Sequence, residues 1–346
     1  PAATIRAMKA WRCHAYGADG NPADAIAKLK LEEDVPIPEP KAGQVQIKVQ
    51  FAGVNPIDWK LFSGGFHGTC PVTFPYTPGF DAAGTISAVG EGVTDFVVGD
   101  EVLVDIGLIE TCTPEPAGFG PAGAFAEFAV VPADLVAKTK GIDMASAAAL
   151  PLAGLTAYQA LFTGAARDFA GKELGKLAAG QKLLILGGST LVGSYAIQMA
   201  KGVGASVTVT ASSKPMPDGK TKLDFVKELG ADAVIDYESQ AWEEVLAGQD
   251  FDMILDGVGK PEDWTAASKV LRKGGQFISI SNFGENAPCD TCTFQNFLLK
   301  SNKADLDVLV DMVKAGKLRL PVDSTVPMSE VPAVLSRSMS MRAGGK

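Results

Sequence analysis

The feature that most constrains this chain is an alternation of short strand-like and helix-like segments between residues 182 and 281. The strand-like segments are apolar and rich in β-branched residues, and in 220–229 the apolar residues fall near helical spacing. Such alternation is typical of a parallel sheet with helices on both faces and right-handed connections. We therefore predict an α/β fold that contains a doubly wound parallel sheet. Strands are expected at 182–187, 206–211, 233–236, 251–256 and 276–281, and helices at 192–202, 220–229, 240–247 and 262–273.

Residues 1–149 follow a different pattern, in which β-like segments are separated by frequent glycine and proline. We expect an antiparallel, partly barrel-like, mainly β domain in this part of the chain. The small, apolar, helical stretch 142–162 then leads into the second domain. A length of 346 residues accommodates two domains of this kind. The β-like segments are 45–53, 84–90, 100–104 and 123–131.

Composition excludes several classes of partner. The formal net charge is −9 and no basic stripe offsets it, so nucleic acid is not expected to bind. The apolar runs are short and interrupted, so no integral membrane segment is expected. The first residues lack the apolar core of a signal peptide, and five cysteines suit a reducing compartment. We expect a cytoplasmic protein, or one in an organelle stroma or matrix after removal of a transit peptide.

Cys289 and Cys292 form a single CxxC pair, "CDTC". A structural zinc site needs four ligands, and only two histidines, His14 and His67, are available to complete one. We therefore expect two ordinary loop thiols and no metal site. The alternative is a redox CxxC at the start of a helix beginning near Thr293.

The stretch 183–201, "LLILGGSTLVGSYAIQMAK", indicates a strand, a glycine turn and a helix. A helix that begins after such a turn directs free N–H groups and a positive dipole toward one point, where a pyrophosphate can bind. Gly187 can form the tight turn and Gly193 can let the helix pack on the strand, whereas Thr190 and Leu191 replace the usual middle glycine. The alternative is an ordinary turn with Ser189 or Thr190 as the helix cap. The candidate phosphate contacts are Gly187, Gly188, Ser189, Thr190, Leu191, Val192 and Gly193.

The end of the next strand indicates which dinucleotide is bound. An enzyme that selects NAD places an acidic residue about 20 positions after the loop, on the ribose hydroxyls. Residues 206–214, "SVTVTASSK", contain no acid and end in Ser212, Ser213 and Lys214. Hydroxyls and an ammonium favour a 2′-phosphate, so we predict NADPH as the cofactor.

Several longer motifs give the sequence a family resemblance. They are "GVNPIDWKLFSG" (53–64), "PYTPGFDAAGTISAVGEGVTDFVVGDEV" (75–102), "GAFAEFAVVP" (123–132), "LPLAGLTAYQAL" (150–161), "GADAVIDY" (230–237) and "GKLRLPVDSTVPMSEV" (316–331). In this order the chain resembles the medium-chain dehydrogenase/reductase superfamily, and within it the zinc-independent quinone oxidoreductases and alkenal/enone reductases. The resemblance implies a GroES-like catalytic domain, 1–149 with 293–346, around a Rossmann nucleotide-binding domain, 150–292.

The resemblance also indicates the chemistry of the site. Zinc-dependent relatives carry a cysteine at the position of Asn55, a histidine at the position of Phe80, and four further cysteines for a second zinc. Without these ligands no Lewis acid is available to activate an alcohol. The candidate catalytic residues are then Asn55 as a neutral donor and Lys60 as a cation, with Asp58 to orient Lys60; bound water is the alternative proton source.

The remaining assignments follow from the resemblance alone. Thr156 is expected near the nicotinamide or the pyrophosphate, Tyr237 near the adenosine, and Val258 and Ser281 at the nicotinamide end. Relatives commonly pair edge to edge, so a homodimer is expected, with 276–281 as the exposed edge strand.

Together these features predict an NADPH-dependent, zinc-independent reductase of quinones or α,β-unsaturated carbonyls. The alternatives are an enoyl-thioester reductase of the same superfamily and a non-catalytic NADPH-binding protein.

Overall fold

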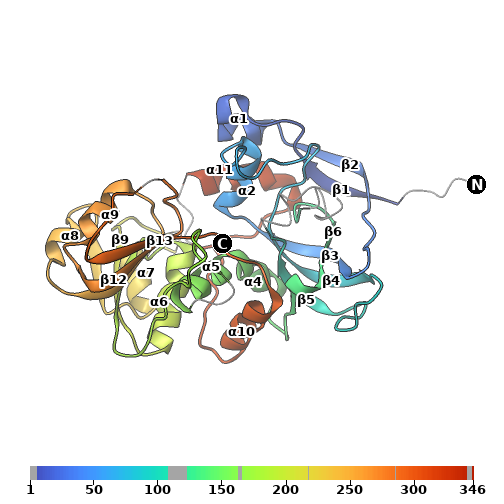
Figure 1. Ribbon diagram of the computed structural model, residues 1–346. Helices are drawn as coiled ribbons and strands as arrows, with labels where there is room; N and C mark the ends of the chain where they lie inside the picture. Colours follow the sequence, from blue (N-terminus) through green and yellow to red (C-terminus); the bar gives the residue numbers. More distant parts are fainter. Residues whose placement is uncertain (1–5, 108–122, 163–165, 217, 285, 341–344) are drawn as a thin grey trace, which may run out of the picture.

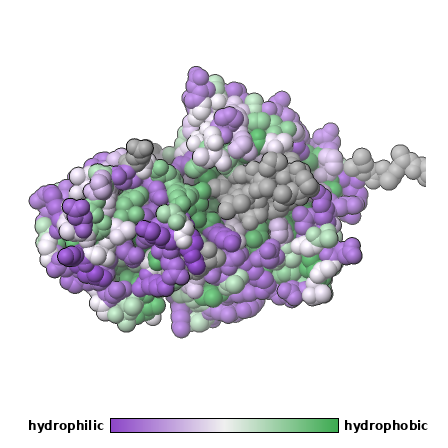
Figure 2. Space-filling view, viewed as in Figure 1, coloured by the Kyte–Doolittle hydropathy of each residue, from purple (hydrophilic) through white to green (hydrophobic). Residues whose placement is uncertain are grey.

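The protein is described here from a computed structural model that covers residues 6–107, 123–162, 166–216, 218–284, 286–340 and 345–346 (Figure 1). Two lobes lie side by side, one built around a parallel sheet and the other around antiparallel strands, with helices α4 and α5 between them. On the face shown in Figure 2, hydrophilic residues cover most of both lobes. In the part of the chain that is described, every helix is too short or too polar to cross a membrane.

The first lobe contains a six-stranded, wholly parallel sheet with the order β10-β9-β8-β11-β12-β13. The strand order reverses beside β8, as the doubly wound α/β prediction requires. The predicted fold class is therefore confirmed. The strands are β8 (Lys182–Leu186), β9 (Ser206–Ala211), β10 (Ala233–Asp236), β11 (Phe251–Asp256), β12 (Leu271–Ser279) and β13 (Cys292–Asn296), and the helices are α6 (Leu191–Gly202), α7 (Lys222–Glu228), α8 (Trp242–Val245) and α9 (Pro261–Ala267).

Three predictions about the last part of this sheet are wrong. Residues Cys292–Asn296 form the edge strand β13 rather than the start of a helix, because Phe294 packs against the rings of both Trp264 and Phe277, with centroids 5.2 and 5.7 Å away. The segment 276–281 consequently lies inside the sheet, between β11 and β13, and has no free edge. The expected domain boundary at 292/293 falls within β13.

The expectation that Cys289 and Cys292 are two free loop thiols is also wrong. Cys289, in the loop before β13, and Cys292, the first residue of β13, form a disulfide, and their Cα atoms are 5.6 Å apart. Among the described residues, the free cysteine is the buried Cys13.

The second lobe contains a five-stranded antiparallel sheet with the order β6-β3-β4-β5-β7, and a separate hairpin of β1 and β2. This arrangement agrees with the predicted antiparallel, mainly β domain. Its strands are β1 (Ala7–Arg12), β2 (Lys30–Pro36), β3 (Gln44–Gly53), β4 (Asp81–Val89), β5 (Glu101–Asp105), β6 (Phe128–Pro132) and β7 (Val136–Lys138). Its helices are η1 (Ala18–Gly20), α1 (Pro22–Ala27), α2 (Pro56–Ser63) and η2 (Ala133–Leu135).

The stretch 142–162 forms α4 (Met144–Ala149) and α5 (Pro151–Phe162), which join the two lobes. Small residues let these helices pack closely, since a Cβ on Gly154 would lie 2.9 Å from Leu150 Cδ1. After β13 the chain continues through α10 (Lys303–Lys314), η3 (Met328–Glu330) and α11 (Val331–Met339). Helix α11 returns to the antiparallel lobe beside α2, where Val331 and Leu335 share a buried cluster with Leu61 (Figure 1).

Asp58 fixes the start of α2 against the segment that precedes β4. Its fully buried carboxylate accepts hydrogen bonds from the backbone N–H groups of Asn55 (2.6 Å) and Phe80 (3.0 Å). Both oxygens therefore serve the backbone, and the expectation that Asp58 orients Lys60 is wrong. Burial raises the pKa of Asp58 to about 8, although the Asn55 N–H acts in the opposite direction.

This pKa shift predicts how stability changes with pH. Because the folded-state pKa of Asp58 is above its unfolded value, its contribution to folding is fully present below pH about 4 and is lost as the pH rises through about 8. Asp58→Asn removes the titration, so the slope of the urea unfolding midpoint between pH 5 and 9 should become shallower. Equal slopes for the variant and the unmodified protein would show that Asp58 does not titrate in this range.

Candidate active site

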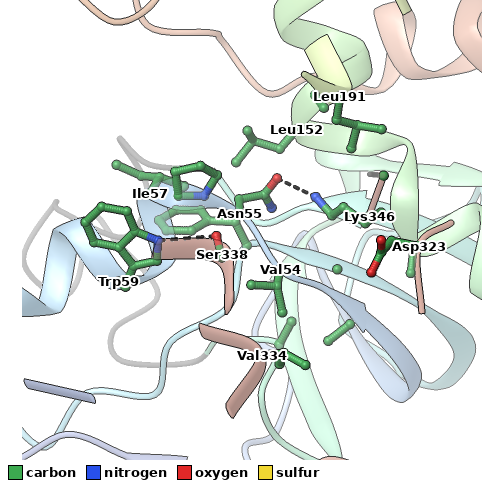
Figure 3. Close-up of a pocket in the computed structure, with 18 of the residues that line it drawn as sticks. Val54, Asn55, Ile57, Trp59, Leu152, Leu191, Asp323, Val334, Ser338 and Lys346 are labelled. Atoms are coloured by element: carbon green, nitrogen blue, oxygen red, sulfur yellow. Dashed lines mark hydrogen bonds between the residues drawn. The ribbon is translucent and has the colours of Figure 1, made fainter. Parts of the chain in front are cut away.

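A cavity of about 870 Å³ lies between the two lobes. Its walls come from the β3–α2 connection, from α5, from the turns after β8 and β11, and from the segments 322–339 and 345–346. Most of the wall is apolar, with Val54, Ile57, Leu152, Leu191 and Val334 among the lining side chains (Figure 3). Such a cavity at the junction of two lobes is where a small ligand and a dinucleotide can meet.

The turn between β8 and α6 has the geometry of a phosphate-binding loop. Gly187 has a φ of +85°, which favours glycine. A Cβ on Gly193 would lie 2.4 Å from the Gly187 carbonyl oxygen, so glycine is needed for α6 to begin this close to β8. The 12-residue α6 begins at the cavity wall, where its N–H groups and dipole favour an anion. The residues present therefore fit the pyrophosphate of a nicotinamide dinucleotide.

The Thr190 hydroxyl is engaged within this loop. It accepts from the Gly193 N–H at 3.0 Å and donates to the Gly187 carbonyl at 2.8 Å, so it caps α6. Leu191 and Val192 line the cavity and pack against the largest hydrophobic cluster, and Ser189 also lines the cavity. Gly188 is held by its N–H, which donates to the Thr210 carbonyl at 2.9 Å, and it packs against Val209.

The end of β9 carries the three residues expected near the adenosine ribose. The Ser212 hydroxyl is buried and, within the described residues, has no hydrogen-bond partner, so it can accept a ligand contact. Ser213 donates to Glu238 at 3.4 Å, and Lys214 Nζ lies 2.8 Å from the Glu238 carboxylate. Sequence reasoning missed Glu238 because this acid follows the neighbouring strand β10 and not β9.

Lys222 was missed as well. It is the first residue of α7, it is half-buried, and it lines the cavity. Partial burial lowers the pKa of its ammonium, as does the neighbouring Lys214, whereas Glu238 acts in the opposite direction. Two ammonium groups and one carboxylate therefore gather at the end of β9.

The other expected cofactor contacts are distributed along the same side of the sheet. Thr156, on α5, lines the cavity and donates its hydroxyl to the Leu152 carbonyl at 2.7 Å. Val258 and Ser281 line the cavity after β11 and β12, and the Val258 N–H is held by Asp256 at 2.8 Å. Tyr237 is 48% exposed beside the end of β9 and outside the cavity, its N–H donating to the Ala211 carbonyl.

The polar part of the cavity centres on Asn55. This buried side chain donates from Nδ2 to Asp81 Oδ2 at 2.9 Å and accepts at Oδ1 from the ammonium of Lys346 (Figure 3). Lys346 Nζ also lies 2.5 Å from Asp81 Oδ2, and the Leu152 N–H donates to Asp81 Oδ1 at 2.8 Å. Asp81 and Lys346 were not predicted. The buried acid in "GFDAAG" was a usable signal for Asp81, whereas nothing local marks Lys346.

Lys60 lines the cavity but remains exposed, and its ammonium lies 5.6 Å from the centre of the Trp59 ring. Burial of part of the side chain lowers its pKa. In the described residues no group of three or more histidine, cysteine or acidic side chains is placed to hold a metal. Phe80 and Asn55, which the family resemblance aligns with metal ligands of zinc-dependent relatives, are both buried.

Comparison with known proteins agrees with this geometry. Residues 41–141 match the alcohol dehydrogenase GroES-like domain, and residues 229–346 match the zinc-binding dehydrogenase family. The chain is 35% identical over 342 residues to 2-methylene-furan-3-one reductase of Solanum lycopersicum, covering 98% of this chain and 78% of that one. It is equally 35% identical over 344 residues, with the same coverages, to the chloroplastic NADPH-dependent alkenal/one oxidoreductase of Arabidopsis thaliana.

A chloroplastic quinone-oxidoreductase homolog of Spinacia oleracea is 32% identical over 347 residues, covering 96% of this chain and 95% of that one. Among solved structures, the quinone oxidoreductase of Coxiella burnetii superposes with a TM-score of 0.77 at 25% identity, over 98% of both chains. The chain therefore belongs to the medium-chain dehydrogenase/reductase superfamily of nicotinamide-dependent oxidoreductases, in the group that contains the quinone oxidoreductases and the alkenal/one reductases.

Proposed function

We propose that this protein is an NADPH-dependent, zinc-independent reductase of quinones or α,β-unsaturated carbonyl compounds. The observation that supports this most directly is the cavity itself, in which an apolar wall surrounds the side chains of Asn55 and Lys346, both hydrogen-bonded to the buried Asp81. An apolar wall suits an electron-poor alkene or quinone, and amide or ammonium donors suit its carbonyl oxygen. The names of the plant relatives, which include alkenal/one and quinone oxidoreductases, support the same substrate class.

The bound cofactor would supply hydride at the nicotinamide carbon C4. Gly187, Gly193 and the N-terminus of α6 would hold its pyrophosphate, and Val258 and Ser281 would flank its nicotinamide. The apolar residues Val54, Ile57 and Leu152 would exclude water from the reacting carbons. Asn55 would donate to the substrate carbonyl through the amide N–H that Asp81 does not use.

Selection of NADPH is supported by the groups at the end of β9. Lys214, Lys222 and the unpartnered Ser212 hydroxyl can all donate to a 2′-phosphate. Glu238 opposes this choice, since a carboxylate repels a phosphate and can instead accept from free ribose hydroxyls. With two cations against one anion, the balance favours the phosphate.

Three substitutions test this selection. Lys222→Ala and Lys214→Ala should each raise the NADPH dissociation constant about 10-fold or more, because a charged hydrogen bond contributes about 1.5–3 kcal/mol. The NADH dissociation constant should change by less than about 2-fold, and Glu238→Gln should strengthen NADPH binding. Lys227→Ala, on the same helix α7, serves as the control. Equal weakening of both cofactors by the lysine variants, or unchanged or weaker NADPH binding in Glu238→Gln, would contradict the proposal.

The enoyl-thioester alternative retains one point of support, a trans-enoyl reductase of Aspergillus terreus that is 30% identical over 368 residues. An enoyl thioester of CoA or of a carrier contains phosphate groups, and this acidic chain shows no clear basic surface at which they could enter. A non-catalytic NADPH-binding protein would not need the buried polar group of Asn55, Asp81 and Lys346.

A substrate panel separates these activities and tests the independence from zinc. NADPH oxidation is measured with a quinone, a short alkenal, a long enone and an enoyl-CoA, before and after prolonged chelation. We expect turnover with the first three acceptors, little with enoyl-CoA, and no loss after chelation. A stoichiometric zinc with chelator-sensitive turnover would contradict the proposal, as would a preference for enoyl-CoA.

We also propose a homodimer, located in the cytoplasm or, as for the chloroplastic plant relatives, in an organelle. The described edges of the parallel sheet are β10 and β13, and we nominate β13 for pairing in place of the predicted 276–281. Light scattering at micromolar concentration should give twice the mass of the 36.0 kDa chain, and a monomer would contradict the proposed homodimer.

We further propose that 1–149 with 297–346 form the catalytic domain.

A further inference from the structure

We propose that the ammonium of Lys346 stabilises the negative charge that develops on the substrate oxygen during reduction. This inference rests on the proposed reductase function and assigns the central electrostatic step of that reaction to a specific residue. It also replaces Lys60, which is exposed and lies over Trp59, as the cation of the site.

The position of Lys346 is fixed from several directions. Its N–H donates to the Pro321 carbonyl at 3.0 Å, and its own carbonyl accepts from the Asp323 N–H at 2.8 Å. The side chain is only 5% exposed, although it lines the cavity. A Cβ on Gly53 would lie 2.4 Å from Lys346 Cε, so glycine at this position makes room for the side chain. Rigid placement of this kind is what electrostatic stabilisation in an active site requires.

The hydrogen bonds of Lys346 leave donor capacity toward the cavity. An ammonium has three N–H donors, and within the described residues its side-chain partners are Asp81 Oδ2 and Asn55 Oδ1. The carboxylate of Asp81 balances the charge of the ammonium in a buried place. Figure 3 shows Lys346 and Asn55 directed toward one another beside the apolar wall that includes Leu152. A carbonyl oxygen bound there could accept from both side chains.

The chemistry then balances without a metal. A hydride brings two electrons and one hydrogen to the β-carbon of the enone, the alkene pair shifts toward the carbonyl, and the oxygen becomes negative. Lys346 donates a hydrogen bond to that oxygen, and the α-carbon takes one proton that ultimately comes from water. The family resemblance aligns Asn55 with a metal ligand of zinc-dependent relatives, and the ammonium hydrogen-bonded to it takes over the electrostatic role of the Lewis acid.

Lys346→Met tests the proposal, because it keeps the length of the side chain and removes the charge. Loss of one oxyanion donor typically lowers kcat by about 10²–10³. We expect kcat with an enone to fall about 100-fold or more, with a smaller change in KM and a change below about 3-fold in the NADPH dissociation constant, measured by fluorescence without substrate. Lys346→Arg should recover part of kcat. Lys140→Met, which removes the exposed ion pair with Asp311, is the control.

A second variant guards against misfolding, since Lys346→Met leaves the Asp81 carboxylate buried without its cation. Asp81→Asn combined with Lys346→Met removes both charges and should fold while kcat remains low. The inference is overturned if a folded variant without Lys346 keeps kcat within about 3-fold, or if the only loss is in NADPH binding. Absence of turnover in the unmodified protein across all quinones and enones would instead reject the proposed function, and the inference with it.

Discussion

The site depends on the hydrogen bonds that the buried carboxylate of Asp81 accepts. An ionised carboxylate without exposure to water is unfavourable unless several donors surround it. Its donors come from three distant segments, namely Asn55 before α2, Leu152 on α5 and Lys346 near the C-terminal end of the sequence. Satisfying one carboxylate therefore brings together the antiparallel lobe, the connecting helix and the returning C-terminal segment at the cavity.

Both ends of the proposed site contain ammonium groups paired with a carboxylate, but the two groups differ in burial and in purpose. At the end of β9, Lys214, Lys222 and Glu238 form a cationic group with one opposing acid, and most of it is accessible to solvent. At Asn55 the polar group is buried, so each hydrogen bond acts in a low dielectric and is correspondingly stronger. The first arrangement suits recognition of a phosphate, and the second suits stabilisation of charge that appears only during reaction.

Sequence reasoning predicted what depends on local pattern. The alternation of 182–281 gave the parallel sheet, and Gly187 and Gly193 gave the loop geometry, because these features follow from neighbouring residues. It missed β13, whose five residues are too few and too polar to show a clear period; the strand is recognised only once Phe294 is seen to pack against Trp264 and Phe277. It missed Glu238, Asp81 and Lys346 as partners, because those contacts depend on which distant segments the fold brings together.

The central claim is that hydride is delivered to an electron-poor carbon in a site without a Lewis acid. The most direct test is reduction of an enone with NADPH labelled with deuterium at nicotinamide C4, followed by NMR analysis of the product. Both C4-deuterated epimers of NADPH are used, because only one of the two C4 hydrogens is transferred. With the epimer whose deuterium is transferred, the proposed function predicts one deuterium at the β-carbon and an intact carbonyl. Deuterium at the carbonyl carbon, with formation of an alcohol, would contradict it.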